Sequence, residues 1–524
     1  MSIDILPSES DLPAADAKPG RPSPLRLVLS GLVVVLVLAL VGGVTVAVRG
    51  LSGGGSQPED VLPAGAFAFA KIDLDPPAGQ KINALRFLRK FPALRDKVSL
   101  DADLREALFE AVADSAGWGE LDFDSDVSPW LGQRVAVAAY APTGAGAGAE
   151  PLGGPLPTVV VALQVSDAGK ARTGLDRLIA ATPGAPDPGV VIQDGFALLA
   201  PDQETADEAA RDAAAGVLAD DENFRSDLEA LGDGVASAWV DMDGVSSVAG
   251  LGLTGLAGVG SFGVGGLNPA GAGGGGRTSY VLRFDGADAL EVRGAVTGST
   301  GVVGPDQPLR GFTDLPKDST VAFGLAGGDG MVPGIFDGLR KVLDDQAAGG
   351  PAGGFDAMVA DAERELGIEL PDDLAVLLGS NLVGALHQGS LAEGELELGA
   401  RVTTDGPRAV SVLDKIATAA RAHGEDFPIV RRLTDDGVIV ASSRAQVDRL
   451  AATGRLGDRD AVRKAMPDLD QATAALWVDV RALVGEFFGD PVVNENLEPV
   501  EGIGMTVQMR GDGAASYRLR LVVN

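Results

Sequence analysis

The chain has 524 residues, a formal net charge of −32, no cysteine and two histidines, His387 and His423. One hydrophobic core usually stops growing near ~250 to 300 residues, so this length favours two lobes over a single core. The missing cysteines exclude disulfides, thiolate nucleophiles and thiolate metal sites, the acidity argues against a nucleic-acid partner, and we expect no cofactor.

The N-terminal part of the chain predicts a membrane anchor. Residues 1–26 are rich in Pro, Ser, Ala and Asp and predict a disordered tail. Leu27 to Val48 are 22 consecutive uncharged residues, of which 15 are Leu or Val. A helix of that length spans roughly 33 Å at ~1.5 Å per residue, close to the ~30 Å hydrocarbon core of a bilayer. We therefore expect a transmembrane helix from residue 27 to residue 48 that contacts membrane lipid.

Positive charges on either side of this segment predict its orientation. Three basic residues precede it, whereas Arg49 alone follows it before Lys71. Positive residues concentrate on the cytoplasmic side of membrane helices, so we expect a single-pass plasma-membrane protein with a cytoplasmic N-terminus and an extracytoplasmic C-terminal domain. A cleaved signal peptide is the alternative, because Thr45 and Ala47 are small enough for a processing site. Against it, the apolar run exceeds the usual ~7 to 15 residues of a signal peptide.

Beyond a Gly/Ser-rich linker at residues 49–58, the chain repeats itself. The clearest repeated landmarks are a hairpin at Val190 to Leu199 with an Asp194-Gly195 turn, matched by Val430 to Val440 with an Asp436-Gly437 turn, and Trp239-Val-Asp241, matched by Trp477-Val-Asp479. Seven such landmarks keep their order, which predicts an internal duplication. We expect a first lobe over residues 59–305, with a Gly-rich insertion at 246–276, and a second lobe over 306–524.

Both halves combine short apolar runs, Asp-Gly turns suited to hairpins, and intervening helical patterns. Helices are expected at Gln80 to Phe91 and at Gln203 to Leu218. Because hairpins make neighbouring strands antiparallel, we expect an α+β fold. In this fold the N-terminal transmembrane helix is followed by two duplicated lobes with mainly antiparallel sheets and packed helices.

Three alternating acids form a candidate cation site. Asp122, Asp124 and Asp126 have the spacing that starts a calcium-binding loop, because hard cations need several carboxylate oxygens in one turn. The rest of the motif fails, since Val127 stands where the loop needs glycine and Gln133 where it needs a bidentate glutamate. An acidic turn at the start of a strand is the alternative.

Catalytic motifs are found only in unsuitable contexts. Gly258 to Gly263 matches a dinucleotide-binding fingerprint inside a glycine-rich tract, and Gly50 to Gly54 matches a nucleophile elbow inside the linker. A serine triad would need His387 or His423, and no serine stands in a matching signature. We therefore expect a non-enzymatic protein without catalytic residues. A cell-envelope hydrolase that uses carboxylates is the alternative.

One basic segment, residues 71–97, interrupts the acidic domain. On the expected helix from residue 80 to residue 91, the apolar side chains would face one way and Lys81, Arg86, Arg89 and Lys90 the other. Such a basic face suits contact with anionic headgroups or with an envelope polymer. A solvated face paired with the domain's own acids is the alternative.

Parts of the same region resemble a known family. The stretches DVLPAGAFAF (60–69), DLDPPAGQK (73–81), ALRFLRKFP (84–92) and SPWLG (128–132) are similar to domain of unknown function family 3352, bacterial proteins that often carry one N-terminal membrane helix. The resemblance extends over most of residues 59–524 and implies no activity, cofactor or site residues. The sequence thus favours a membrane-tethered extracytoplasmic module that binds an envelope protein or polymer.

Overall fold

The computed structural model describes most of the chain beyond the linker. The described residues are 55–74, 76–92, 105, 106, 109, 113, 118–142, 157–182, 187–246, 275–299, 307–346, 354–387, 397–424, 429–487 and 497–524. The expected tail at 1–26, the transmembrane helix at 27–48, and most of the linker and of the Gly-rich insertion lie outside these residues. Within the described ranges, no helix has the length and apolar character needed to cross a membrane.

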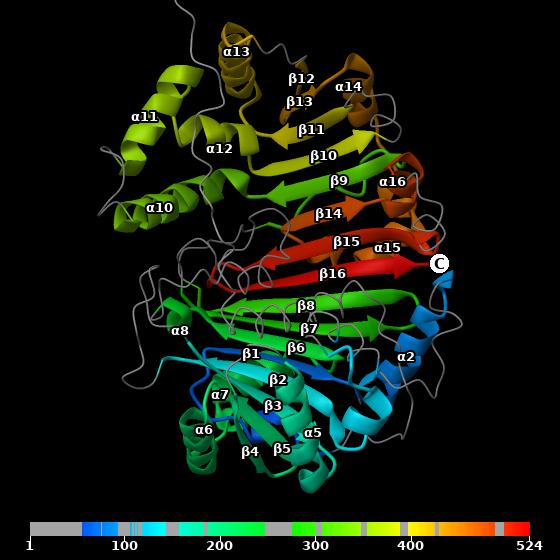
Figure 1. Ribbon diagram of the computed structural model, residues 1–524. Helices are drawn as coiled ribbons and strands as arrows, with labels where there is room; N and C mark the ends of the chain where they lie inside the picture. The colour runs from blue at the N-terminus through cyan, green and yellow to red at the C-terminus, as the bar shows by residue number, and fades with distance from the viewer. Residues whose placement is uncertain are drawn as a thin grey trace, which may run out of the picture.

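Strands form the framework of the molecule (Figure 1). Their bounds are β1 Ala68–Asp73, β2 Leu131–Tyr140, β3 Thr158–Val165, β4 Gly189–Gln193, β5 Phe196–Ala200, β6 Ala236–Asp241, β7 Arg277–Asp285, β8 Ala289–Thr297, β9 Ser319–Ala326, β10 Asn381–His387, β11 Leu398–Thr403, β12 Val430–Thr434, β13 Gly437–Ala441, β14 Ala474–Val478, β15 Val500–Met509 and β16 Ala515–Val523. All join in one 16-stranded sheet with antiparallel neighbours. The predicted antiparallel α+β character is confirmed, but one sheet runs through both halves where we expected a sheet in each lobe.

The strand order is the same in the two halves. The first eight strands are ordered β4-β5-β3-β2-β1-β6-β7-β8, and the last eight are ordered β12-β13-β11-β10-β9-β14-β15-β16. Each strand of the first half therefore has a counterpart eight strands later. The halves meet where β8 pairs with β16, which leaves β4 and β12 as the two edge strands. The expected boundary between residues 305 and 306 falls outside the described residues.

Helices pack on both faces of the sheet. Their bounds are α2 Ala78–Leu88, α5 Ala168–Ala181, α6 Gln203–Ala215, α7 Glu222–Glu229, α8 Met242–Ser246, α10 Gly328–Gln346, α11 Gly354–Leu366, α12 Asp372–Leu378, α13 Gly406–Ala422, α14 Arg444–Ala451, α15 Asp460–Ala465 and α16 Val480–Phe487. We call face A the sheet face that carries Trp239 and Trp477, where α6, α7, α14 and α15 pack. Helices α2, α5, α12 and α13 pack on the opposite face, face B. Both helices expected from the sequence are present, each about one turn shorter at its C-terminal end.

The two repeated tryptophans mark equivalent positions in the cores of the halves. Trp239 on β6 and Trp477 on β14 have exposed fractions of 2% and 0%. Trp239 lies opposite Phe69 of β1, and Trp477 lies opposite Ala322 of β9. Burying such large rings contributes most where several strands and helices converge on them. The two tryptophans therefore serve as equivalent reference positions from which the strands of the two halves can be aligned.

The two edge hairpins turn differently. Asp194 and Gly195 connect β4 to β5 with positive φ angles of 48° and 80°, as a two-residue turn between twisted strands requires. In the second half, Asp435 and Asp436 make the connection, and Gly437 is already the first residue of β13. The predicted second turn is thus displaced by one residue.

A buried charged cluster joins the two halves on face A. Glu291 of β8 has an exposed fraction of 0% and lies among four arginines of β7, β8 and β16. These are Arg283, Arg293, Arg518 and Arg520, and two of them also pair with Asp468 and Asp285. We call Glu291 and its four arginines the joint cluster. Charges buried this deeply persist only when they are paired, so the cluster ties β8 to β16 by more than backbone hydrogen bonds.

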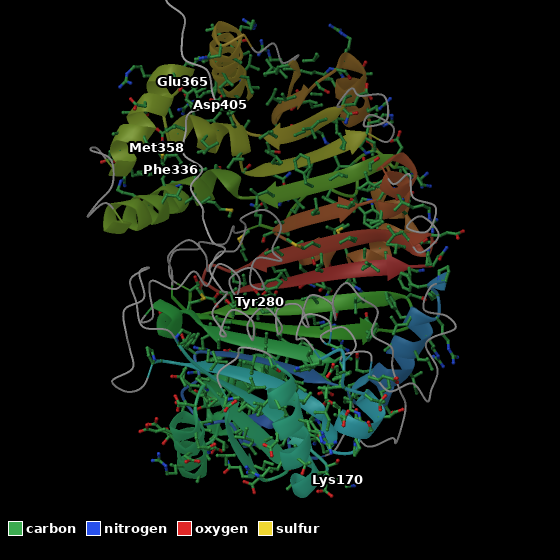
Figure 2. All side chains as sticks on the ribbon, viewed as in Figure 1. Lys170, Tyr280, Phe336, Met358, Glu365 and Asp405 are labelled. Atoms are coloured by element: carbon green, nitrogen blue, oxygen red, sulfur yellow. The ribbon has the colours of Figure 1, made fainter. Side chains whose placement is uncertain are left out.

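Aromatic packing supports the same junction on face B. Tyr280 of β7 lies near the middle of the sheet (Figure 2), and its ring packs against Tyr517 of β16 with a centroid separation of 5.3 Å. Burial raises the pKa of both hydroxyl groups, most strongly that of Tyr517. Residue 294 of β8 must be glycine here, because a Cβ would lie 2.0 Å from the Tyr517 ring.

Candidate functional site

A cleft of about 750 Å³ opens on face A of the second half. Its floor consists of β10, β11, β13 and β12, which form one end of the sheet (Figure 1). Its rim consists of residues 307–311 before β9, residues 327–330 at the start of α10, and the last turn of α14. Cavities of roughly 300 to 1,000 Å³ are typical of sites for small organic ligands. The cleft is therefore the best candidate for a functional site in the described structure.

The rim segment 307–311 is held in place by side chains of the floor. The amide group of Asn381 on β10 accepts a hydrogen bond from the backbone N–H of Arg310 at 2.9 Å and donates one to the Arg310 carbonyl at 3.1 Å. Arg401 of β11 donates from Nη2 to the carbonyl of Gly311 at 3.0 Å. Leu309 and Phe312 point into the core beneath. The segment that walls the cleft is thus anchored to the floor by three hydrogen bonds and to the core by two apolar side chains.

Arg401 is the unusual group of this cleft. Its side chain is half-buried, and its Nε atom is shielded from solvent without a hydrogen-bond partner. Burial lowers the pKa of the Arg401 guanidinium, although the more distant charges of Asp314 and Asp436 act in the opposite direction. No carboxylate of the described residues is close enough to Arg401 for an ion pair. The guanidinium charge is therefore incompletely neutralised in a chain rich in acids.

Further polar groups surround Arg401. Arg432 of β12 reaches the cleft but pairs with Asp448 of α14, while Arg310 is exposed on the rim. Carboxylates are supplied by two aspartates, Asp329 at the start of α10 and Asp436 in the edge hairpin. Hydroxyl and amide groups are supplied by Ser380, Asn381, Thr403 and Thr434. The cleft thus offers a cationic centre with hydrogen-bond acceptors around it.

The counterpart of Arg401 in the first half can be identified from the strand pairing. Starting from the tryptophans, the pairing leads through Ala138 and Ala385 to Val160 of β3 and Gly399 of β11. Two residues further along each strand lie Ala162 and Arg401. Ala162 is therefore the structural counterpart of Arg401.

In the first half this position belongs to the packed core. Ala162 has an exposed fraction of 0% and contacts the apolar cluster that includes Phe196, Leu198 and Phe224. The pairing aligns Phe196 with Gly437 of β13, so a large ring is replaced by no side chain. At these two positions the first half places an alanine and a phenylalanine in its core, whereas the second half has Gly437 and Arg401, and Arg401 lines the cleft. The cleft is a difference between two otherwise similar halves.

The three aspartates of the candidate cation site lie around a single turn of helix on the other face. Asp122 accepts hydrogen bonds from the backbone N–H and the hydroxyl of Ser125, which lower the pKa of its carboxyl group. Asp126 pairs with Arg177 of α5 at 2.8 Å, and Asp124 is exposed. Across the described residues, no three His, Asp or Glu side chains are arranged as metal ligands. The observed contacts of Asp122 and Asp126 are those of a helix cap and an ion pair.

The basic residues of α2 and of the two positions that follow it do not share one face. Arg86 and Arg89 are exposed, and Lys90 pairs with Asp288, whose pKa it lowers. Lys81 has an exposed fraction of 1%, so its expected position on the basic face is wrong. The reason is the packing of α2 on β7, where the neighbouring Gln80 exchanges hydrogen bonds with the backbone of Phe284 and draws the start of the helix against the sheet.

Sequence reasoning did not identify the residues of the cleft. A signal was present in the repeat, because the apolar run of β3 from Val159 to Leu163 is matched in β11 by a run that contains Arg401. A charged residue inside a matched core strand marks a place where the halves differ. Recognising it would have required the register that the strand pairing supplies.

Fold and site define an α+β protein with one continuous antiparallel sheet and a polar cleft of ligand size. Residues 28–231 match the family described as Protein of unknown function (DUF3352), which confirms the family resemblance over that part of the chain. The match runs from the apolar N-terminal segment to the end of α7 and does not include the cleft. No curated protein and no solved structure matches the chain.

Proposed function

We propose that this protein is a membrane-tethered, extracytoplasmic binding module that holds a ligand in the cleft of its second half. The observation that carries the proposal is the cleft itself, with Arg401 partly buried on its floor and without an ion-pair partner among the described residues. Its counterpart in the first half is solid core, so the opening is not a general property of the fold. A polar cleft at a position that is packed core in the other half supports a role in ligand recognition.

The chemistry of the lining supports binding over catalysis. The described lining contains arginine, aspartate, serine, threonine and asparagine, and it has no histidine, lysine or cysteine. Proton transfer near neutral pH is most often performed by histidine, or by acids whose pKa burial has raised toward neutral pH. A carboxylate hydrolase that uses Asp329 and Asp436 is the second candidate, and it would require both acids to reach one substrate.

Two sequence features support the membrane placement. The 22 uncharged residues from 27 to 48 have the length of a membrane crossing, and three basic residues precede them whereas only Arg49 follows them before Lys71. The family match begins at residue 28 and therefore includes nearly all of the apolar segment. In this proposal the sheet lies outside the cytoplasm and is connected to the membrane through residues 49–58.

We also infer that the two halves arose by internal duplication. The sequence landmarks keep their order, and the eight strands of each half follow the same spatial order. Two unrelated halves would rarely share one order of eight strands and also carry a tryptophan at the equivalent position of the sixth strand. In this inference, the cleft is a difference that arose between the halves after the duplication.

Site-specific labelling tests the membrane placement, because the chain has no native cysteine. In full-length protein expressed in a bacterial membrane, Lys170→Cys should react with a membrane-impermeant maleimide on intact cells, since Lys170 is exposed at one end of the molecule (Figure 2). Ser8→Cys should react only after permeabilisation. Labelling of Ser8→Cys on intact cells would contradict the orientation. A mature chain that lacks Ser8 altogether would show that the segment is a cleaved signal peptide.

Blocking the cleft tests its role in binding. Thr434 is an exposed cleft residue at the end of edge strand β12, so Thr434→Trp should fill the cleft without disturbing the core. Species that co-purify with the tethered wild-type protein from its native membrane should fall by about tenfold or more with this variant.

The matched control uses the equivalent edge of the first half. Gln193 ends β4 as Thr434 ends β12, so Gln193→Trp adds the same ring far from the cleft. The control should capture the same species as the wild-type protein. Equal capture by all three proteins would contradict a binding role for the cleft, provided that their thermal unfolding midpoints agree.

A further inference from the structure

We propose that the cleft recognises its ligand through a carboxylate group held by Arg401, with hydroxyl groups of the same molecule directed at Asp329 and Asp436. This inference rests on the proposed binding function and specifies the chemical class of the ligand. It follows from the charge, the hydrogen bonding and the size of the site.

The positive charge of Arg401 favours an anionic ligand group. Its guanidinium donates one hydrogen bond to the Gly311 carbonyl and has no ion pair with the described acids, which leaves donor capacity on the terminal nitrogens. The bond to Gly311 holds one terminal nitrogen of the guanidinium at the cleft floor. A planar carboxylate matches the planar guanidinium well, and charge-assisted hydrogen bonds of this kind are among the strongest in proteins.

The surrounding charges favour a singly charged group over a dianion. Asp314 and Asp436 are near enough to influence the charge of Arg401, and Asp329 also lines the cleft. A phosphate dianion would be repelled by these acids more strongly than a carboxylate with one charge. The exposed Arg310 at the rim balances only part of this negative field.

The remaining lining specifies the rest of the ligand. The cleft volume of about 750 Å³ is far larger than a lone carboxylate, so the anionic group belongs to a larger organic molecule. Asp436 accepts a hydrogen bond from the Thr434 hydroxyl at 3.0 Å, and its remaining acceptor sites and those of Asp329 suit hydroxyl donors, while Thr403 can donate or accept. The described lining includes no aromatic side chain, so stacking does not select the ligand. A polyhydroxylated carboxylate fits these groups.

A matched pair of sugars tests the proposal on the full-length wild-type protein. D-galacturonate and D-galactose share their ring hydroxyls and differ in a carboxylate against a CH₂OH group. In ligand-observed NMR titrations, galacturonate should bind about tenfold more tightly than galactose, because a hydrogen bond to a charged partner is worth more than a neutral one. Inorganic phosphate should displace it poorly. Equal binding of both sugars, or stronger binding of phosphate, would overturn the carboxylate assignment while leaving the cleft as a binding site.

Variants locate the binding group. Arg401→Gln should abolish the preference for galacturonate, and Arg401→Lys should retain part of it because the positive charge remains. Arg225→Gln is the control, since Arg225 is an exposed arginine of α7 in the first half. A preference that survives Arg401→Gln would overturn the role of Arg401. If Arg401→Gln does not fold, Thr434→Trp is used in the same titration. Loss of the preference for galacturonate in this variant would show that the sugar binds in the cleft, and an unchanged preference would overturn the cleft as the binding site.

Discussion

Replacing Glu291 with alanine is expected to lower the free energy of unfolding by about 3 to 5 kcal/mol, because removing one partner of a buried ion pair leaves its counter-charges uncompensated. Glu291 has an exposed fraction of 0% and lies among the four arginines of the joint cluster. Without it, like charges from β7, β8 and β16 would face one another where the two halves meet. Urea unfolding of the full-length protein in detergent, followed by circular dichroism, measures the change.

The control for this prediction is a glutamate with a single exposed partner. Glu229 has a side-chain exposure of 71% and faces Arg225 one helical turn away, so Glu229→Ala should cost no more than about 0.5 kcal/mol. A loss of less than about 1 kcal/mol for Glu291→Ala would show that the arginines can be solvated where they stand. In that case the joint cluster would not hold the halves together.

The second large effect is expected at Trp477. Replacing it with alanine should destabilise the protein by about 3 to 5 kcal/mol, since the indole is fully buried in the face A core and its removal leaves a cavity. Arg459 also stacks on the ring at 5.4 Å from its centroid and would lose that contact. The same urea unfolding measures this change, with Leu433→Ala at an exposed edge position as the control.

A comparison with phenylalanine separates the ring from its N–H group. The Trp477 Nε1 is buried without a hydrogen-bond partner among the described residues, whereas Trp239 Nε1 donates to Asp227 at 3.0 Å. Trp477→Phe should therefore cost less than Trp239→Phe, which leaves a buried carboxylate with one donor fewer. The reverse ranking would contradict the stabilising role assigned to the hydrogen bond between Trp239 and Asp227.

The repeat could be predicted because short local sequence patterns recur in both halves. Paired landmarks such as the two Trp-Val-Asp motifs, alternating apolar strands and Asp-Gly turns are each contained within about ten residues. Such signals predicted the antiparallel pairing and the helices at Gln80 and Gln203. They were less accurate at ends and turns, as in the second edge hairpin, where the turn lies one residue earlier than expected.

The burial of Lys81 shows where local patterns fail. A helical projection shows the direction in which each side chain leaves the helix axis. It does not show how much of the helix surface is buried by other elements of the fold. Because α2 is bound to β7 through Gln80 and the Phe284 backbone, its first turn is covered more widely than the apolar stripe indicates. The placement of Lys81 depended on residues some 200 positions away.

By itself, the sequence determined the class of the fold and the equivalence of the halves, because strand alternation, turns and repeated landmarks are short-range properties. Tertiary structure alone decided how the halves join and where a ligand can enter. The joint depends on pairing between β8 and β16, and the cleft depends on a contact between Arg401 and Gly311 that spans 90 residues. No local pattern encodes such contacts, since they arise only when distant segments are brought together and the same strand position is closed in one half and open in the other.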